Sequence, residues 1–369
     1  MTDVLIIGGG LSGLAMARLL HGAGRSFMVI EGRDRFGGRI LTDSAGIDLG
    51  PAWIWPGQPR IAALLRSLDL RTYPQHGSGE FLHENDVGIA LRGRGRSILE
   101  GALRIVGGMG KLVDTLVHDL PEGSLRTGSP VVEIVRDADG VTARTADGQE
   151  FKARRVVLAL PPRLTTRIRF APDLPDGVER ALSAVPTWMA AHAKAVAVYD
   201  RPFWRMAGLS GDAVSQTGPL AEIHDACGPG GGPPYALFGF QSAAPVARLD
   251  EEATQFAILE QLDRLFGPEA ARPVSLHLKD WSHDPMTASQ ADHNTPPRHP
   301  VYGIPRGAEA LWDGRLLLAG TEMAATSGGY LEGALEAAGA AFAQIAPEDV
   351  RRLREASPLS RLRGSNHPR

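Results

Sequence analysis

The sequence has little cysteine, little lysine and no long hydrophobic run. Its single cysteine, Cys227, excludes an intramolecular disulfide framework and a multi-cysteine metal site, and it favours a reducing compartment. No stretch reaches the ~18 apolar residues that a membrane span requires, which predicts no membrane span. The first residues contain no basic segment and no small-residue cleavage site, so we expect no targeting peptide and a cytoplasmic protein.

The net charge and the histidine spacing give no indication of a nucleic acid, an anionic membrane or a metal ion as partner. Lys and Arg total 39, of which only 4 are Lys, a bias that we take as typical of a GC-rich bacterial genome. The net charge of −3 gives no electrostatic reason to expect nucleic acid or an anionic membrane as partner. The histidines show no metal-ligand spacing, so we expect no metal site. With 369 residues, 43% of them hydrophobic, the chain is expected to form about two globular domains.

A dinucleotide-binding pattern occupies the first 31 residues. The apolar run 4–7 predicts a buried parallel strand, residues 8–13 fit G-x-G-x-x-G, and residues 14–20 have helical spacing. The three glycines permit a tight turn, close approach to a pyrophosphate and close helix–strand packing, and an acid after the second strand can accept hydrogen bonds from ribose hydroxyls. The alternative is a glycine-rich turn without a nucleotide. The residues assigned to this contact are Gly8, Gly10, Leu11, Ser12, Gly13 and Glu31.

The next segments resemble those of the flavin-containing amine oxidase superfamily, which is monoamine oxidase-like. Residues 32–39 are similar to its E-A-x-x-x-x-G-G-R segment, which wraps the FAD pyrophosphate and ribose. Residues 48–53 resemble its D-L-G-G-x-[WY] turn near the isoalloxazine, with Pro51 where the second glycine usually stands. The resemblance adds to the FAD contacts Arg33, Gly38, Arg39, Gly50, Pro51, Ala52 and Trp53.

The resemblance continues through about residues 3 to 345. Residues 129–134 are similar to the strand that meets adenine, and residues 280–285 to a W-x-x-D-P segment. Residues 319–334 resemble the closing A-G-T-E…S-G-Y-x-E-G-A of monoamine oxidases, at a second strand-to-helix junction. These segments add to the implied FAD contacts Val131, Trp281, Gly320, Thr321, Glu322, Gly329, Tyr330, Leu331 and Ala334.

Three residues are predicted to be catalytic: Lys194, Tyr330 and Trp281. Lys194 interrupts an apolar strand pattern, so it must be buried, paired or functional, unless it points to solvent from an edge strand. In the resembling enzymes the matching lysine holds a water against flavin N5, where a lysine of lowered pKa can shuttle a proton or assist reaction with O₂. Tyr330 matches one wall of an aromatic substrate cage; the alternative is a core tyrosine. Trp281 is expected to line the flavin or the substrate channel.

The segment 287–291 departs from the family pattern at two positions. The second aromatic wall falls nearest to Ala291, so that wall is missing. Where covalent members have a cysteine bonded to the flavin, the nearest residue is Gln290, so the resemblance implies FAD held non-covalently.

The resemblance implies an α/β fold with a Rossmann-type, glutathione reductase-like FAD-binding domain. That domain is expected to be discontinuous, because nucleotide segments lie at both ends and in the middle of the chain. A smaller α+β substrate domain is expected on an antiparallel sheet. We predict residues 1–75, 102–165 and 306–346 for the first domain, 76–101 and 166–305 for the second, and a polar tail at 347–369.

The implied activity is FAD-dependent oxidation of a small amine. A hydride equivalent passes to flavin N5, the imine hydrolyses to an aldehyde or ketone and ammonia, and O₂ reoxidises the flavin to give H₂O₂. The implied partners are therefore a small-molecule amine and O₂, and a homodimer is left open. One alternative is a desaturase or protoporphyrinogen-oxidase-like enzyme, against which Lys194 and Tyr330 argue. Another is a flavin-binding protein without amine turnover.

Overall fold

The computed structural model describes residues 1–241, 250–293, 296 and 298–348. The chain divides into two compact units, the first formed by residues 1–36, 116–185 and those from 301, the second by 37–115 and 186–300. The predicted tail lies outside the described residues from position 349. This division does not decide the functional domain bounds, which stay a prediction.

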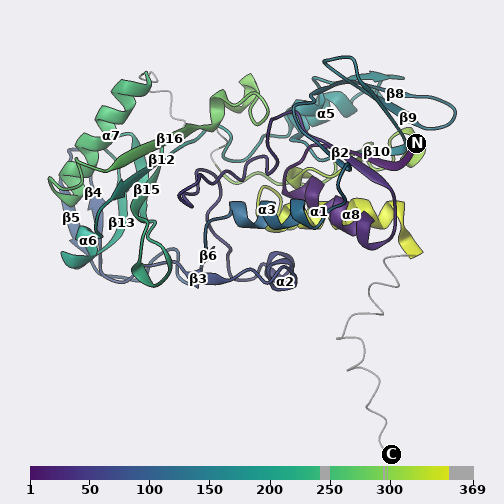
Figure 1. Ribbon diagram of the computed structural model, residues 1–369. Helices are drawn as coiled ribbons and strands as arrows, with labels where there is room; N and C mark the ends of the chain where they lie inside the picture. The colour runs from purple at the N-terminus through teal and green to yellow at the C-terminus, as the bar shows by residue number, and fades with distance from the viewer. Residues whose placement is uncertain (242–249, 294–295, 297, 349–369) are drawn as a thin grey trace, which may run out of the picture. The chain divides into compact units, whose positions relative to one another are not determined.

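The first unit contains an eight-stranded mixed sheet (Figure 1). The strands follow the order β11-β8-β9-β10-β1-β2-β7, and β17 also pairs with β10. The pairs β10–β1, β1–β2, β2–β7 and β10–β17 are parallel. The strands are β1 (Thr2–Ile7), β2 (Phe27–Ile30), β7 (Leu125–Arg126), β8 (Val131–Arg136), β9 (Val141–Thr145), β10 (Glu150–Leu158), β11 (Arg169–Ala171) and β17 (Leu316–Leu318).

Helices α1 and α8 pack against each other in this unit, although they come from opposite ends of the chain (Figure 1). The helices are α1 (Leu11–Gly22), α4 (Pro162–Thr165), α5 (Val178–Ala184) and α8 (Leu331–Ile345), with 3-10 turns η4 (Trp312–Gly314) and η5 (Thr321–Met323). The apolar run 4–7 is buried throughout, as expected of a parallel strand covered on both faces. The predicted α/β class is confirmed at this level: the fold is mixed, with parallel and antiparallel pairing.

The second unit is built on a seven-stranded sheet in the order β16-β12-β15-β14-β13-β4-β5. All its pairs are antiparallel except β13–β4. The strands are β4 (Glu80–Glu84), β5 (Ala90–Gly93), β12 (Ala193–Tyr199), β13 (Leu209–Ser215), β14 (Leu220–Asp225), β15 (Tyr235–Gln241) and β16 (Ser275–Asp280), besides the separate pair β3 (Thr72–Pro74) and β6 (Leu103–Ile105). The helices are α2 (Pro59–Ser67), α6 (Phe203–Met206), α7 (Glu251–Phe266), η1 (Pro229–Gly231), η2 (Trp281–His283) and η3 (Gln290–His293), while α3 (Gly110–His118) contains the passage from the second unit into the first.

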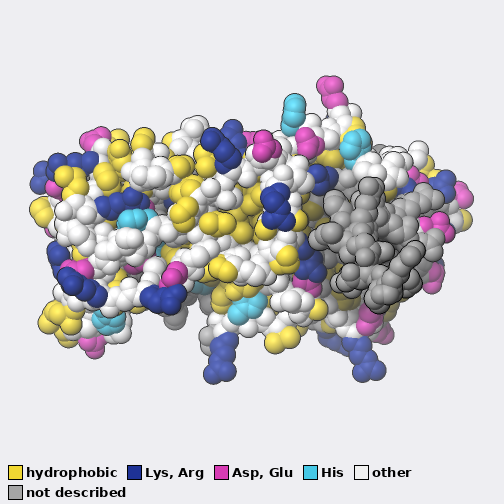
Figure 2. Space-filling view, turned by 90° about the horizontal axis from the view of Figure 1, so that it is seen from below, with side chains coloured by type: hydrophobic (Ala, Val, Ile, Leu, Met, Phe, Trp, Pro, Cys, Tyr) yellow, Lys and Arg dark blue, Asp and Glu magenta, His cyan; other side chains and the backbone are white. Residues whose placement is uncertain are grey.

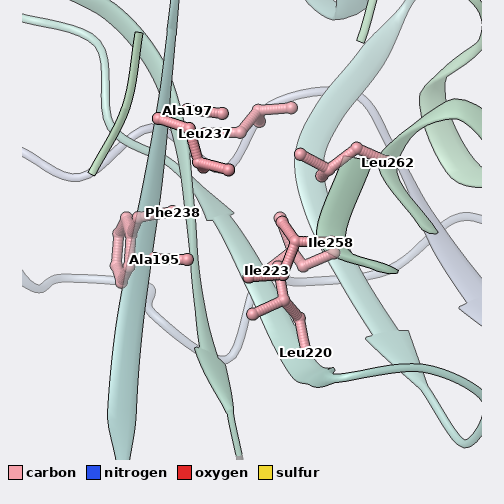
Figure 3. A pocket seen from close by; sticks show the side chains of 9 residues that line it. Ala195, Ala197, Leu220, Ile223, Leu237, Phe238, Ile258 and Leu262 are labelled. Atoms are coloured by element: carbon pink, nitrogen blue, oxygen red, sulfur yellow. The ribbon is translucent and has the colours of Figure 1, made fainter. Parts of the chain in front are cut away.

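Helix α7 covers one face of this sheet. That face is apolar, whereas the opposite face carries charged side chains such as Lys194. Ala195, Ala197 and Tyr199 of β12 belong to the core cluster that includes α7. Because side chains alternate along a strand, Lys194 and Val196 point to the opposite face. The space on the α7 side is apolar and too narrow to hold a water molecule, so it is part of the packed core (Figure 3). It is lined by Ala195, Ala197, Leu220, Ile223, Leu237, Phe238, Ile258, Leu262 and Leu276.

The distribution of charge on the surface and the polarity of the helices agree with the near-neutral net charge and the lack of long apolar runs. On the face shown in Figure 2, basic and acidic side chains are interspersed among the described residues. Within the ranges that the structure covers, no helix has both the length and the apolar character needed to cross a lipid bilayer.

Candidate active site

The loop between β1 and α1 is shaped by glycines that no other residue can replace. Gly8 has φ +105°, and a Cβ there would lie 2.6 Å from the Ala159 carbonyl oxygen. A Cβ on Gly13 would lie 1.9 Å from the Gly8 carbonyl oxygen. Helix α1 begins at Leu11 after the N-cap Gly10, with no side-chain cap and no acidic residue in its first turn. Its N–H groups are therefore oriented for an anion.

Glu31 fixes this loop from the end of β2. Its carboxylate is 4% exposed, and it accepts hydrogen bonds from the N–H groups of Gly9 (2.7 Å) and Arg33 (2.8 Å). The Arg33 guanidinium lies 3.6 Å from the same carboxylate. The predicted ribose acceptor is thus buried beside the predicted pyrophosphate loop, as the spacing of the two motifs requires.

The C-terminal motif meets the same loop within the first unit. The Ser12 hydroxyl donates a hydrogen bond to the Ala319 carbonyl, and a Cβ on Gly320 would lie 2.2 Å from the Leu160 carbonyl oxygen. The Thr321 hydroxyl donates to the Tyr330 carbonyl at 2.8 Å, which ties the strand end to the N-cap of α8. Residues 319–330 therefore form one connected junction next to the start of α1.

The other predicted residues of this unit lie around the two helix starts. Glu322 is fully buried, whereas the N-cap residue Tyr330 is 40% exposed. Gly329 has φ +81°, a left-handed conformation that favours glycine. Leu331 and Ala334 lie at the start of α8, and Val131 is the first residue of β8.

In the second unit, the turn at residues 48–50 is held at three consecutive positions. The buried Asp48 carboxylate accepts hydrogen bonds from the Met109 N–H (2.7 Å) and the Thr42 hydroxyl (2.5 Å). The Leu49 carbonyl accepts from the Trp281 indole N–H at 2.9 Å, and the Gly50 carbonyl accepts from the Lys194 ammonium at 3.0 Å. This turn joins Gly50, Lys194 and Trp281 of the predicted site.

Glycines again set the shape of this region. A Cβ on Gly50 would lie 2.0 Å from the Arg39 carbonyl oxygen, so the predicted residues Arg39 and Gly50 are in backbone contact. Gly38 has φ +58°. Pro51 is half-buried and Ala52 is buried directly after this contact.

Lys194 lies on an internal strand, β12, between β15 and β16, and is 2% exposed. The alternative of a solvent-facing edge-strand lysine is therefore wrong. Burial is the main cause that lowers its pKa, to about 7 overall; the Asp48 carboxylate opposes this effect and the Arg104 charge adds to it. Its ammonium lies 4.2 Å from the centre of the Phe238 ring. Near neutral pH this amine can both give and accept a proton.

Trp281 and Trp53 both lie near the face of the sheet that carries Lys194. Trp281 is 7% exposed, and the Lys279 ammonium lies 4.8 Å from its ring centre. Trp53 donates its indole N–H to Gln75 at 2.9 Å, and its ring lies edge-on to His224 and tilted against Phe238. Lys194, Trp281 and Trp53 thus belong to the second unit, whereas Tyr330 belongs to the first.

The structure also shows the surroundings of Gln290, Ala291 and Cys227. Gln290 and the exposed Ala291 lie in η3, where no aromatic side chain follows before His293. The glycine-rich sequence at 226–232 predicts a flexible loop in which Cys227 has no role, but Cys227 is 2% exposed and part of the apolar core, so this prediction is wrong about its surroundings. Burial raises the pKa of its thiol to about 12. Among the described residues, no group of three or more His, Cys, Asp or Glu is placed to hold a metal ion.

Sequence reasoning missed several residues of this face. They are Asp48, Asp212, Glu222, His224, Phe238 and Phe240. The alternating pairs Glu222/His224 and Phe238/Phe240 are separated by two residues, which is the strand period, so their shared face was readable. Their neighbours on other strands were not.

The comparisons with known proteins agree with one another. The family model described as "Flavin containing amine oxidoreductase" matches residues 11–100 and 89–346. A probable flavin-containing monoamine oxidase A of Dictyostelium discoideum is 25% identical, covering 90% of this chain and 95% of the relative. Amine oxidase [flavin-containing] B of Sus scrofa is 26% identical over 93% of this chain and 86% of its own length.

Solved structures show a shared fold. Wild-type putrescine oxidase bound to putrescine matches with a TM-score of 0.77 and 23% identity, over 94% of this chain and 99% of that one. Cyclohexylamine oxidase from Brevibacterium oxydans matches with the same TM-score, identity and coverage.

Proposed function

This chain belongs to the flavin-containing amine oxidoreductase family, and on that premise we propose that it oxidises a small primary or secondary amine. The family implies FAD as the cofactor and an oxidoreductase acting on amines. The single observation that carries the proposal is Lys194, a buried amine with a pKa near 7 held against the Gly50 carbonyl on an aromatic sheet face. Such a group is suited to moving a proton during amine oxidation.

The residues present fit FAD. The glycine cradle at residues 8–13 leaves no room for a Cβ at Gly8 or Gly13, and it lies at an uncapped helix start. Glu31 is buried beside it with a carboxylate that suits ribose hydroxyls. The predicted cofactor residues of this loop and of residues 319–334 support the proposal as a set, and their role in binding FAD remains our inference.

We further propose that FAD is held without a covalent bond. Gln290 stands where the family resemblance puts a linking cysteine. The protein's single cysteine, Cys227, is buried in the apolar core, and its raised thiol pKa opposes the thiolate that such a bond requires.

The proposed reaction converts an amine to an imine, with O₂ as the final acceptor. FAD held by the glycine loop at residues 8–13 and by Glu31 would supply the acceptor for a hydride equivalent from the amine carbon, and O₂ would take up these electrons to form H₂O₂. Lys194 would hold or relay the proton that leaves the amine nitrogen. Water would then hydrolyse the imine to a carbonyl compound and ammonia, or to a carbonyl compound and a primary amine when the substrate is a secondary amine. Trp281 orients the residue 49 carbonyl beside Lys194.

The remaining expectations stay part of the proposal. We place the FAD-binding domain at residues 1–75, 102–165 and 306–346 and the substrate domain at 76–101 and 166–305. A cytoplasmic location rests on the single cysteine, and a bacterial origin on the excess of Arg over Lys. A homodimer remains an open part of the proposal.

The exposed Ala291 supports a second candidate, a flavin-binding protein without amine turnover, because an aromatic wall is expected there. The deciding experiment is an absorbance spectrum of purified protein with FAD, before and after anaerobic addition of primary, secondary and aromatic amines. We expect the oxidised-flavin bands to bleach with at least one class and to return with air as H₂O₂ forms. Bands that persist with every amine would favour the second candidate or a desaturase-like enzyme. Protein that takes up no FAD would overturn the cofactor assignment.

A further inference from the structure

A carboxylate shares a sheet row with Lys194. Lys194 of β12 is the cross-strand partner of Phe240 on β15, and Phe240 is the partner of Glu222 on β14. Directly opposite residues in antiparallel strands point to the same face. Adjacent strands lie about 4.8 Å apart, so two strand spacings put the backbones of Lys194 and Glu222 about 10 Å apart. Glu222 therefore stands on the Lys194 face of the sheet, with one strand between them.

The surface between these two residues is aromatic. The rings of Phe238 and Phe240 lie 5.6 Å apart, and Trp53 lies 5.2 Å and 6.0 Å from them. Phe240 and Trp53 are half-buried, so part of this surface is accessible. Such a surface suits the methylene chain of an aliphatic molecule, and it carries no charge of its own.

A buried histidine supports the carboxylate. His224 is 1% exposed, and its Nδ1 hydrogen-bonds Asp212 at 2.9 Å. Its Nε2 makes no hydrogen bond among the described residues and lies 3.6 Å from Glu222 Oε2, which is too long for one. Interaction with His224 lowers the pKa of Glu222, against the effect of burial. Asp212 also accepts a hydrogen bond from Ser97, so it is held as an acceptor.

The charges of this group sum to a negative value. Asp212 and Glu222 together carry −2, and His224 adds at most +1, so the group has a net charge of −1 or −2. The Glu222 side chain is 50% exposed and is the accessible member. A cation is the ligand that this group would attract.

We propose that Glu222, supported by His224 and Asp212, binds the second cationic end of the substrate, so that the preferred substrate is a short aliphatic diamine. This inference rests on the proposed amine oxidation. The reacting amine would lie on the Lys194 side, the methylenes would cross Phe240, and the distal ammonium would pair with the Glu222 carboxylate. A monoamine of equal length would leave the carboxylate unpaired, and such a lost pairing discriminates strongly between substrates.

The test compares substrates that differ only in the second amine. Steady-state kinetics are measured with 1,4-diaminobutane and butylamine, and with 1,5-diaminopentane and pentylamine, for wild type and Glu222→Gln. We expect wild-type kcat/KM to favour the diamine at least about tenfold, the loss typical of one charge-assisted hydrogen bond. In Glu222→Gln that preference should fall about tenfold, mainly through a higher diamine KM. Equal loss for diamine and monoamine, or an unchanged diamine preference, would overturn the proposal.

A matched control lies on the other face of the same sheet. Glu260 is an exposed carboxylate of α7, so Glu260→Gln removes the same charge away from the row. It should leave both substrates unaffected. Loss of the diamine preference in Glu260→Gln would show a general charge effect and would contradict a local subsite. Glu222→Asp, which keeps the charge, should retain part of the preference and guards against a folding defect in Glu222→Gln.

A binding measurement separates this inference from the proposed activity. Anaerobic calorimetry on enzyme whose flavin has been reduced beforehand gives the Kd of 1,4-diaminobutane for wild type and Glu222→Gln, because reduced flavin cannot oxidise the amine. If no amine reduces the flavin, the proposed function fails, and a Kd at least about tenfold weaker in Glu222→Gln still supports the subsite. If amines are oxidised but both proteins bind the diamine equally, the subsite fails and the oxidase stands.

Discussion

The loop after β1 and the sheet face around Lys194 are built by different means. The loop uses missing side chains: its glycines bring backbone atoms so close that a Cβ at Gly13 would lie 1.9 Å from a carbonyl oxygen. The sheet face uses side chains from separate strands, joined by the turn at residues 48–50. The first region therefore has no space for a Cβ at Gly8 or Gly13. The second region depends instead on the charge and polarity of its side chains.

The largest effect is expected from Gly13→Ala. The new methyl group would collide with the Gly8 carbonyl, which forces α1 away from β1 and spoils the phosphate cradle. We expect most of the FAD to be lost on gel filtration, together with about 1–3 kcal/mol of stability. The flavin-to-protein absorbance ratio and a melting curve measure the two effects.

Gly22→Ala on the same helix is the control. An added Cβ at Gly22 meets no atom within 4 Å, so this variant should keep its FAD and gain about 0.5–1 kcal/mol. If both variants retain FAD equally, close packing at Gly13 is not what shapes the site.

The second largest effect is expected from Lys194→Met, which tests the sheet face. The variant keeps an unbranched side chain one atom shorter and removes the amine that we propose to move the proton. We expect the rate of flavin reduction or reoxidation to fall about 100-fold, with FAD still bound. Stopped-flow absorbance separates the two half-reactions. Lys152→Met, at an exposed position of β10, should be neutral; an equal loss there, or none at Lys194, contradicts the assignment.

The last prediction concerns stability, and its sign is defined. Lys194 has a pKa of about 7 when folded and about 10.4 when unfolded, so between these values the unfolded chain binds more protons and wild-type stability rises with pH. Below pH 7 the charged amine is buried at full cost. Lys194→Met removes that cost, so its advantage over wild type should be greatest below pH 7 and vanish near pH 10.4. Urea titrations at pH 6, 8 and 10 measure it; a difference independent of pH would exclude the lowered pKa.

The first region could be predicted from the sequence because its parts are contiguous. The strand at 4–7, the glycine turn and Glu31 are local, and each lies where the spacing placed it. The hydrogen bond from Ser12 to Ala319 could not be derived from spacing, although the motifs at both ends indicated a shared role.

The second region could be predicted only in part. Lys194 was identified because it is a charge within an apolar strand and because the family resemblance matches it to a functional lysine. Its neighbours Phe240 and Glu222 depend on the register of three strands whose order along the sheet differs from their order in the sequence. A slip of one residue would turn each side chain to the other face, and no local pattern sets that register. Asp48 begins the segment matched to the D-L-G-G-x-[WY] turn, but no role was predicted for it, because it holds the Thr42 hydroxyl and the Met109 N–H, the second of which is distant in the sequence.

The hydrogen bond between Ser12 and Ala319 also constrains the order in which the protein can be assembled. The two residues are 307 positions apart. Strand β1 also pairs on one side with β10, which is synthesised later. At about 5–20 residues per second, a ribosome needs roughly 15–60 s to synthesise the chain between them. During that time the nascent glycine loop lacks the segment that completes it. We therefore expect the loop to reach its final form, and FAD to bind there, only after residue 319 has been synthesised.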